Sequence, residues 1–176
     1  DLCHQMGITS YMEPVYAISL GSADLSPYQI VSAYNTYPSK GIHVDPFLVT
    51  RIEDNNGNVL ATFTQSKQEV LSQQTAYLMV NMMQGVVNEG TGGRLRRLYM
   101  PKGEVAGKTG TTNNNSNAWF IGYTPKITAG VWVGNEDVDS YLLGDGARMA
   151  LPIWGLFIQK VLADSKVNIW DTDKFE

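Results

Sequence analysis

The sequence has little of what metal-binding and disulfide-rich proteins need. Its 176 residues include one cysteine, Cys3, and two histidines, His4 and His43. A single cysteine cannot form an internal disulfide, and the histidines do not stand in a pattern of zinc ligands. We therefore expect no disulfide framework, no metal site and no cofactor.

The sequence also lacks an excess of positive charge and any long apolar run. Thirteen Lys and Arg against 17 Asp and Glu give a formal net charge of −4, which argues against a nucleic-acid or anionic-membrane surface. Its apolar runs are shorter than the roughly 18 residues of a membrane span. The basic trio Arg94, Arg96 and Arg97 is interpreted as a solvated turn. The remaining composition, 43% hydrophobic and 17% charged, is that of a globular chain of single-domain length.

The pattern of residues 1–103 predicts a helical region with one β-hairpin. Leu2 to Gly7 resemble the end of a helix closed by a glycine, so we expect the chain to be a fragment of a longer protein. Ser26-Pro27 begins a helix that runs through Pro38, and Ser72 caps a second helix that ends before Gly90. Between them, Asn56-Gly57 predicts the turn of a hairpin over residues 47–63.

Residues 104–135 change to strand character, and a helix follows. The three short strands 105–111, 118–123 and 127–133 are expected to pair antiparallel. The residues that follow, up to Met149, are predicted to form a loop. Pro152 is interpreted as the start of a final amphipathic helix within 148–164. We expect an α+β domain with one antiparallel sheet.

The strand around Lys108 concentrates the residues that suit ligand binding. Lys108 supplies a positive charge, and Thr109 and Thr111 place two hydroxyls on one face of the strand. Gly110 allows another backbone to come close. A cation beside hydroxyls suits a carboxylate. A phosphate-binding P-loop is excluded by spacing, because that motif needs a glycine where Lys102 stands.

The surroundings of this strand resemble class A (bifunctional) penicillin-binding proteins. The segments that carry the resemblance are Gly107-Lys108-Thr109-Gly110-Thr111-Thr112, Ala118-Trp119-Phe120-Ile121-Gly122-Tyr123-Thr124-Pro125, Ala129-Gly130-Val131-Trp132-Val133-Gly134, Gly90-Thr91-Gly92 and Ala150-Leu151-Pro152-Ile153-Trp154. They extend over nearly the whole chain. The resemblance implies the C-terminal portion of the serine β-lactamase/penicillin-binding transpeptidase fold.

The resemblance also implies a role for each residue of the strand. In this family a serine attacks the penultimate D-Ala carbonyl of a peptidoglycan stem peptide, and β-lactams acylate the same serine. Lys108 would then be catalytic, while Thr109, Gly110 and Thr111 would bind the substrate or the β-lactam. The backbone N–H of Thr111 would form half of the oxyanion hole. Trp119 is expected to pack the sheet instead of touching substrate.

Two of the family's three motifs are absent from the sequence. Neither Ser-x-x-Lys nor Ser-x-Asn occurs, so we expect this chain to lack the nucleophile and to be inactive alone. The resemblance implies a parent protein with an N-terminal glycosyltransferase part and a membrane anchor, facing the periplasm or the cell exterior. The expected partners are stem peptides, β-lactams, the remaining N-terminal part and, through the unpaired edge of strand 127–133, a second copy.

Two other functions share the Lys-Thr-Gly strand. A β-lactam-binding sensor domain would bind the antibiotic without crosslinking peptides, and a serine β-lactamase would hydrolyse it. The run from Ala118 to Pro125 and the hairpin favour the synthase. A β-lactamase would also need a base that activates water, and no such residue is recognisable.

Overall fold

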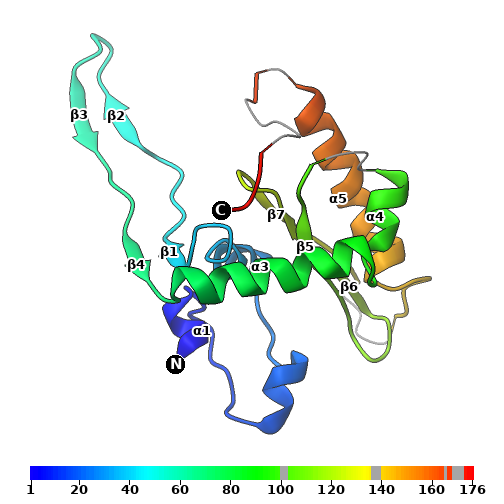
Figure 1. The fold of residues 1–176 in the computed structure, drawn as a ribbon. Helices are drawn as coiled ribbons and strands as arrows, with labels where there is room; N and C mark the ends of the chain where they lie inside the picture. Colours follow the sequence, from blue (N-terminus) through cyan, green and yellow to red (C-terminus); the bar gives the residue numbers. More distant parts are fainter. Residues whose placement is uncertain (100–102, 136–139, 165, 168–172) are drawn as a thin grey trace.

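The computed structural model describes residues 1–99, 103–135, 140–164, 166–167 and 173–176. It combines helices with antiparallel sheets (Figure 1), which confirms the predicted α+β class. The elements in chain order are α1 (Leu2–Gln5), the 3₁₀ helix η1 (Tyr16–Leu20), α2 (Pro27–Tyr34), β1 (Ile42–Val44), β2 (Arg51–Glu53), β3 (Val59–Thr62), β4 (Lys67–Glu69), α3 (Gln73–Asn88), α4 (Gly93–Leu98), β5 (Ala106–Thr111), β6 (Asn117–Tyr123), β7 (Thr128–Gly134) and α5 (Gly146–Ala163).

The central sheet is a three-stranded antiparallel meander in the order β5-β6-β7. Its register places Gly110 opposite Trp119, and Trp119 opposite Trp132. Among the described strands, β5 and β7 each pair only with β6. Each therefore presents an unpaired edge.

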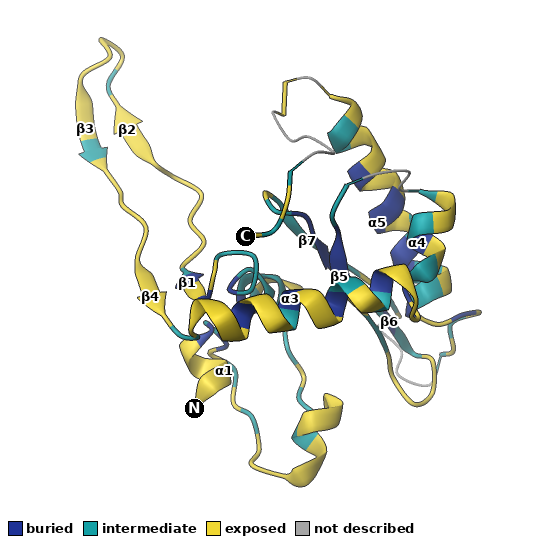
Figure 2. Cartoon of the chain, in the orientation of Figure 1, coloured by how far each residue is buried: buried dark blue, intermediate teal, exposed yellow. Residues whose placement is uncertain are grey.

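Helices cover both faces of this sheet. Side chains alternate between the faces along a strand, so Phe120 and Tyr123 of β6 point to opposite sides. Phe120 packs against Trp154 of α5, whereas Tyr123 packs against Met83 of α3. Burial raises the pKa of the Tyr123 hydroxyl, which stays neutral and donates to the Met83 sulfur at 3.6 Å. The sheet is thereby fixed between α3 and α5 (Figure 2).

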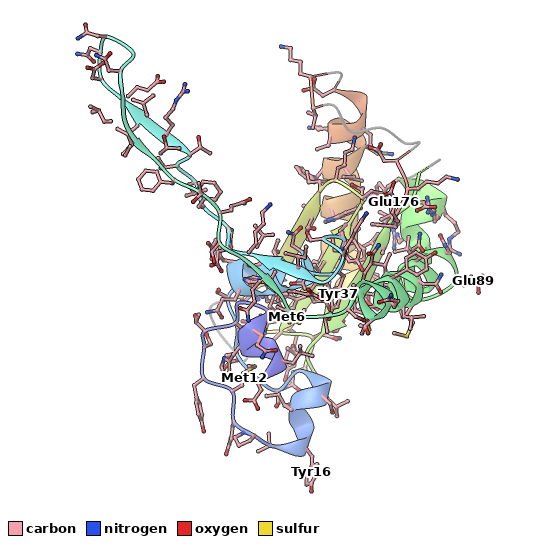
Figure 3. The ribbon with its side chains drawn as sticks, turned by 60° about the vertical axis from the view of Figure 1, so that its left-hand side comes forward. Met6, Met12, Tyr16, Tyr37, Glu89 and Glu176 are labelled. Atoms are coloured by element: carbon pink, nitrogen blue, oxygen red, sulfur yellow. The ribbon has the colours of Figure 1, made fainter. Side chains whose placement is uncertain are left out.

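A third, smaller core holds the N-terminal segment. Met6 packs with Ala33 of α2, and Met12 and Tyr37 lie at the border of this cluster. Figure 3 labels Met6, Met12 and Tyr37 in this part of the molecule, while Tyr16 on η1 points into solvent. The N-terminal segment is thus attached near Met6 and Met12, and the stretch that carries η1 lies on the surface.

A long hairpin projects from the body of the molecule (Figure 1). Strands β2 and β3 pair antiparallel on either side of Asn56-Gly57, inside the predicted range 47–63. Below them β1 pairs with β4, a pairing that the sequence pattern did not predict. The hairpin is exposed along its length (Figure 2), and Leu48 is 99% exposed.

The helix starts at Ser26 and Ser72 are confirmed. Each serine side chain accepts a hydrogen bond from a backbone N–H of the first turn, as expected of an N-cap. The first of these helices, however, ends at Tyr34, and turns replace the predicted helix from there to Pro38.

The predicted start of the last helix at Pro152 and the predicted turn at the arginine trio were wrong. The final helix, α5, begins at Gly146 with Asp145 as its N-cap, and Pro152 lies inside it. The arginine trio lies on helix α4, not in a solvated turn, because buried Leu95 anchors that helix to the core. Arg96 is partly buried, and its guanidinium donates to the Gly103 carbonyl and to Asn88 Oδ1.

Candidate functional site

The unpaired edge of β5 presents backbone groups to solvent. The Thr112 N–H donates to the Asn117 carbonyl at 3.1 Å, so position 112 directs its backbone groups toward β6. These groups alternate in direction along an antiparallel strand. Thr109 and Thr111 therefore direct their N–H and C=O groups to the unpaired edge, where a ligand can bind them.

Lys108 places its charge at the same edge. Its side chain is exposed, and its Nζ donates to the Thr109 carbonyl at 2.7 Å. This carbonyl is one of the groups that face away from β6. The ammonium thus lies beside the outward backbone of the strand and supplies a positive charge at this edge.

The Thr109 hydroxyl is held by a residue from another part of the chain. Its Oγ1 lies 2.8 Å from the Thr91 Oγ1, and the two hydroxyls share a hydrogen bond. Thr91 lies in the turn between α3 and α4, just beyond Glu89, which Figure 3 labels at the end of α3. The sequence pattern assigned no role to Thr91.

The Thr111 hydroxyl is held by the start of α5. Its Oγ1 accepts a hydrogen bond from the Gly146 N–H at 3.1 Å. Gly146 is the first residue of the helix, where backbone N–H groups lack partners within the helix. Because the oxygen already accepts this N–H, the Thr111 hydroxyl keeps its own proton for donation to a ligand.

Gly146 also lets α5 touch the backbone of the sheet. A Cβ added there would lie 2.5 Å from the Gly110 carbonyl oxygen and would also collide with the Trp119 carbonyl. We expect Gly146→Ala to destabilise the fold by about 1–3 kcal/mol, because neither backbone oxygen can move aside easily. Urea-induced unfolding checks this.

Gly85 provides the matched control for that substitution. It lies inside α3 with nothing within 4 Å of an added Cβ. Gly85→Ala should therefore stabilise the protein by roughly 0.5–1 kcal/mol. Equal effects of the two substitutions would contradict the role given to Gly146.

Trp119 packs within the sheet. It lies against Trp132, with 6.3 Å between ring centroids, and an added Cβ at Gly110 would approach its Cβ to 3.1 Å. The Trp132 Nε1–H donates to Asn117 Oδ1 at 2.7 Å. Asn117 thus ties β6 to β7.

Comparison with known proteins identifies the family. The family described as "Penicillin binding protein transpeptidase domain" matches residues 9–148. The chain belongs to this transpeptidase family. It is 40% identical over 146 residues to penicillin-binding protein 1A of Aquifex aeolicus, and 35% identical over 161 residues to that of Clostridium acetobutylicum. These alignments cover 81% and 90% of this chain but only 19% of each relative.

Solved structures agree on the fold of this transpeptidase segment. Penicillin-binding protein 1A of Haemophilus influenzae superimposes with a TM-score of 0.83 at 21% identity, over 92% of this chain and 30% of that one. PonA1 of Mycobacterium tuberculosis gives 0.83 at 24% identity, over 99% and 50%. The predicted transpeptidase fold is therefore confirmed.

The transpeptidase site residues expected from the sequence all lie on β5. Lys108 contacts the Thr109 carbonyl at its unpaired edge, and Thr111 is the last residue of the strand. Their contacts to Thr91 and Gly146 were not foreseen, because no local pattern links positions that are 18 and 35 residues apart.

Neither a membrane-spanning helix nor a metal-binding cluster occurs in the described part of the chain. Within it, no helix is both long enough and apolar enough to cross a membrane. In the same residues, no cluster of three or more His, Cys, Asp or Glu side chains is placed to hold a metal ion.

Proposed function

We propose that this chain is the C-terminal part of a peptidoglycan D,D-transpeptidase domain and supplies its substrate-binding strand. The observation that carries the proposal is the edge of β5, where the Lys108 ammonium contacts the Thr109 carbonyl while Thr91 and Gly146 hold the hydroxyls of Thr109 and Thr111. The family membership and the names of the relatives support it.

Each group at this edge has a role in acyl transfer. A stem peptide would lie along β5 as an added antiparallel strand, bound by the outward backbone groups of Thr109 and Thr111. The terminal carboxylate would accept hydrogen bonds from both hydroxyls, with Lys108 supplying positive potential. The Thr111 N–H would stabilise the oxyanion that forms when the scissile carbonyl is attacked.

The attacking serine would come from outside this chain. The sequence has no Ser-x-x-Lys and no Ser-x-Asn motif, which the family uses for the nucleophile and its partners. We propose that a longer parent protein provides them in its N-terminal part, together with a glycosyltransferase domain and an anchor that places the site outside the cytoplasmic membrane. The isolated chain would then be inactive and would self-associate through the unpaired edge of β7.

Intact-mass measurement with benzylpenicillin tests this proposal. We expect one covalent adduct on the parent protein and none on the 176-residue chain, because an acyl-enzyme needs the missing serine. A stable adduct on the isolated chain would show that it carries a reactive serine of its own. The absence of any adduct on the parent would contradict the transpeptidase proposal itself.

A further inference from the structure

We infer that Thr91 is a positioning residue that orients the Thr109 hydroxyl toward a substrate carboxylate; the inference rests on the function proposed above. Thr91 belongs to none of the three family motifs and lies on a different element from the Lys-Thr-Gly strand. Its hydroxyl is 2.8 Å from that of Thr109.

The turn that carries Thr91 is tightly held on the end of α3. The Gly90 and Gly92 N–H groups donate to carbonyls of the last helical turn, at Gly85 and Val86, each at 3.0 Å. An added Cβ at Gly90 would lie 2.9 Å from the Val86 Cα, and one at Gly92 would lie 3.1 Å from the Val86 oxygen. The two glycines thus let the turn lie flat on the helix and fix Thr91 in place.

Helix α3 in turn fixes this turn relative to β5. Val80 and Met83 of the helix pack in one core cluster with Ala106, the first residue of β5. Thr91 and Thr109 therefore belong to two elements that share a core, and their contact does not depend on a loose surface loop. A group held in this way can orient its neighbour when the site is occupied.

The chemistry of a hydroxyl explains what Thr91 does. A hydroxyl has one proton to donate and accepts through its lone pairs, whereas a carboxylate only accepts. The Thr111 oxygen accepts the Gly146 N–H, so its proton is left for a ligand. The Thr109 hydroxyl reaches the same state when Thr91 donates to it, and a bound carboxylate selects this orientation of the pair. Both threonines then present protons to the carboxylate.

This arrangement makes Thr91 a determinant of specificity for a carboxylate. With Thr91 donating to the Thr109 oxygen, the Thr109 proton is directed to the ligand, and an ester at that place accepts it more weakly than a carboxylate does. Removing the Thr91 hydroxyl should therefore weaken recognition of a carboxylate more than that of its neutral ester.

The test compares acylation rates of the parent protein with benzylpenicillin and with its methyl ester. We expect Thr91→Val to lower the second-order rate constant of acylation by benzylpenicillin about three- to tenfold, which is the usual effect of losing one hydrogen bond. Thr91→Ser, which keeps the hydroxyl, should stay within about twofold of wild type. With the methyl ester the loss should be clearly smaller, and Thr91→Val should stay within about twofold of the wild-type rate.

Thr75 provides the matched control. Its Oγ1 pairs with the Ser72 Oγ at 2.9 Å, at the opposite end of α3, so Thr75→Val removes a similar hydroxyl pair far from the site and should leave both rates unchanged. An unchanged benzylpenicillin rate in Thr91→Val, an equal loss with the ester, or a failure of serine to restore the rate would each overturn the inference. A wild-type parent that forms no adduct would instead refute the proposed function, and this inference with it.

Discussion

Replacing Lys108 by alanine should lower the rate at which benzylpenicillin acylates the parent protein by about 100- to 1,000-fold. Losses of that size follow when one positioned charge or donor is removed from an acyl-transfer site. The Lys108 ammonium lies at the outward edge of β5, 2.7 Å from the Thr109 carbonyl. Its removal would take away the positive charge that is proposed to attract the substrate carboxylate and to assist proton transfers near the nucleophile.

The fold should not change with this substitution. The Lys108 side chain is exposed, and replacing an exposed residue of this kind alters the free energy of unfolding by less than about 0.5 kcal/mol. Stopped-flow acylation and urea denaturation on the same preparation separate the two effects. A large loss of rate with unchanged stability is the expected result.

Two variants sharpen this prediction. Lys67 is an exposed lysine on β4, and Lys67→Ala should leave the acylation rate unchanged. Lys108→Arg keeps the charge but cannot give up its proton, so it should retain part of the rate if electrostatic attraction contributes. A loss of less than about fivefold in Lys108→Ala would contradict the catalytic role proposed for this residue.

The sequence allowed prediction of elements whose determinants are local. Ser26 and Ser72 mark helix starts because a serine side chain caps the first turn wherever the helix lies. Asn56-Gly57 marks the hairpin because a tight turn needs such residues, and Gly57 has φ +83°. The Lys-Thr-Gly strand was recognisable because its chemistry is carried by adjacent residues.

Elements that depend on distant contacts could not be predicted in this way. Pro152 suggests a helix start, yet α5 begins six residues earlier, because buried Leu151 and Trp154 on either side of the proline offset its missing hydrogen bond. The pairing of β1 with β4 joins positions as far apart as Ile42 and Glu69. Neither strand is longer than three residues, so neither shows a clear alternation.

The candidate site shows the same difference between features set by neighbouring residues and features set by distant contacts. The residues of β5 carry a motif, whereas Thr91 and Gly146 contribute through contacts that arise only when α3 and α5 pack on the sheet. The Gly90-Thr91-Gly92 sequence was visible as part of the family resemblance. The contact of Thr91 with Thr109 was not visible, because nothing in the three residues indicates which strand the hydroxyl faces.

Trp154→Ala should be the most destabilising single substitution proposed for this fold, at about 3–5 kcal/mol. The side chain is fully buried and meets Phe120 edge to face, with 5.4 Å between ring centroids. Its Nε1–H donates to the Ala129 carbonyl at 3.0 Å. It also lies so close to Gly122 that a Cβ there would be 2.7 Å from its ring, so alanine would leave a cavity against the backbone of β6.

Trp132→Ala gives the matched comparison, since it removes the same type of side chain from strand β7 of the sheet on which α5 packs. Trp132 is 43% exposed, and its main polar contact is the hydrogen bond to Asn117. Its loss should cost only about 1 kcal/mol. Urea denaturation of the parent transpeptidase domain measures both values. If the two substitutions destabilised it equally, α5 would not anchor the sheet through Trp154, and the Gly146–Thr111 contact at the start of that helix would lose its structural support.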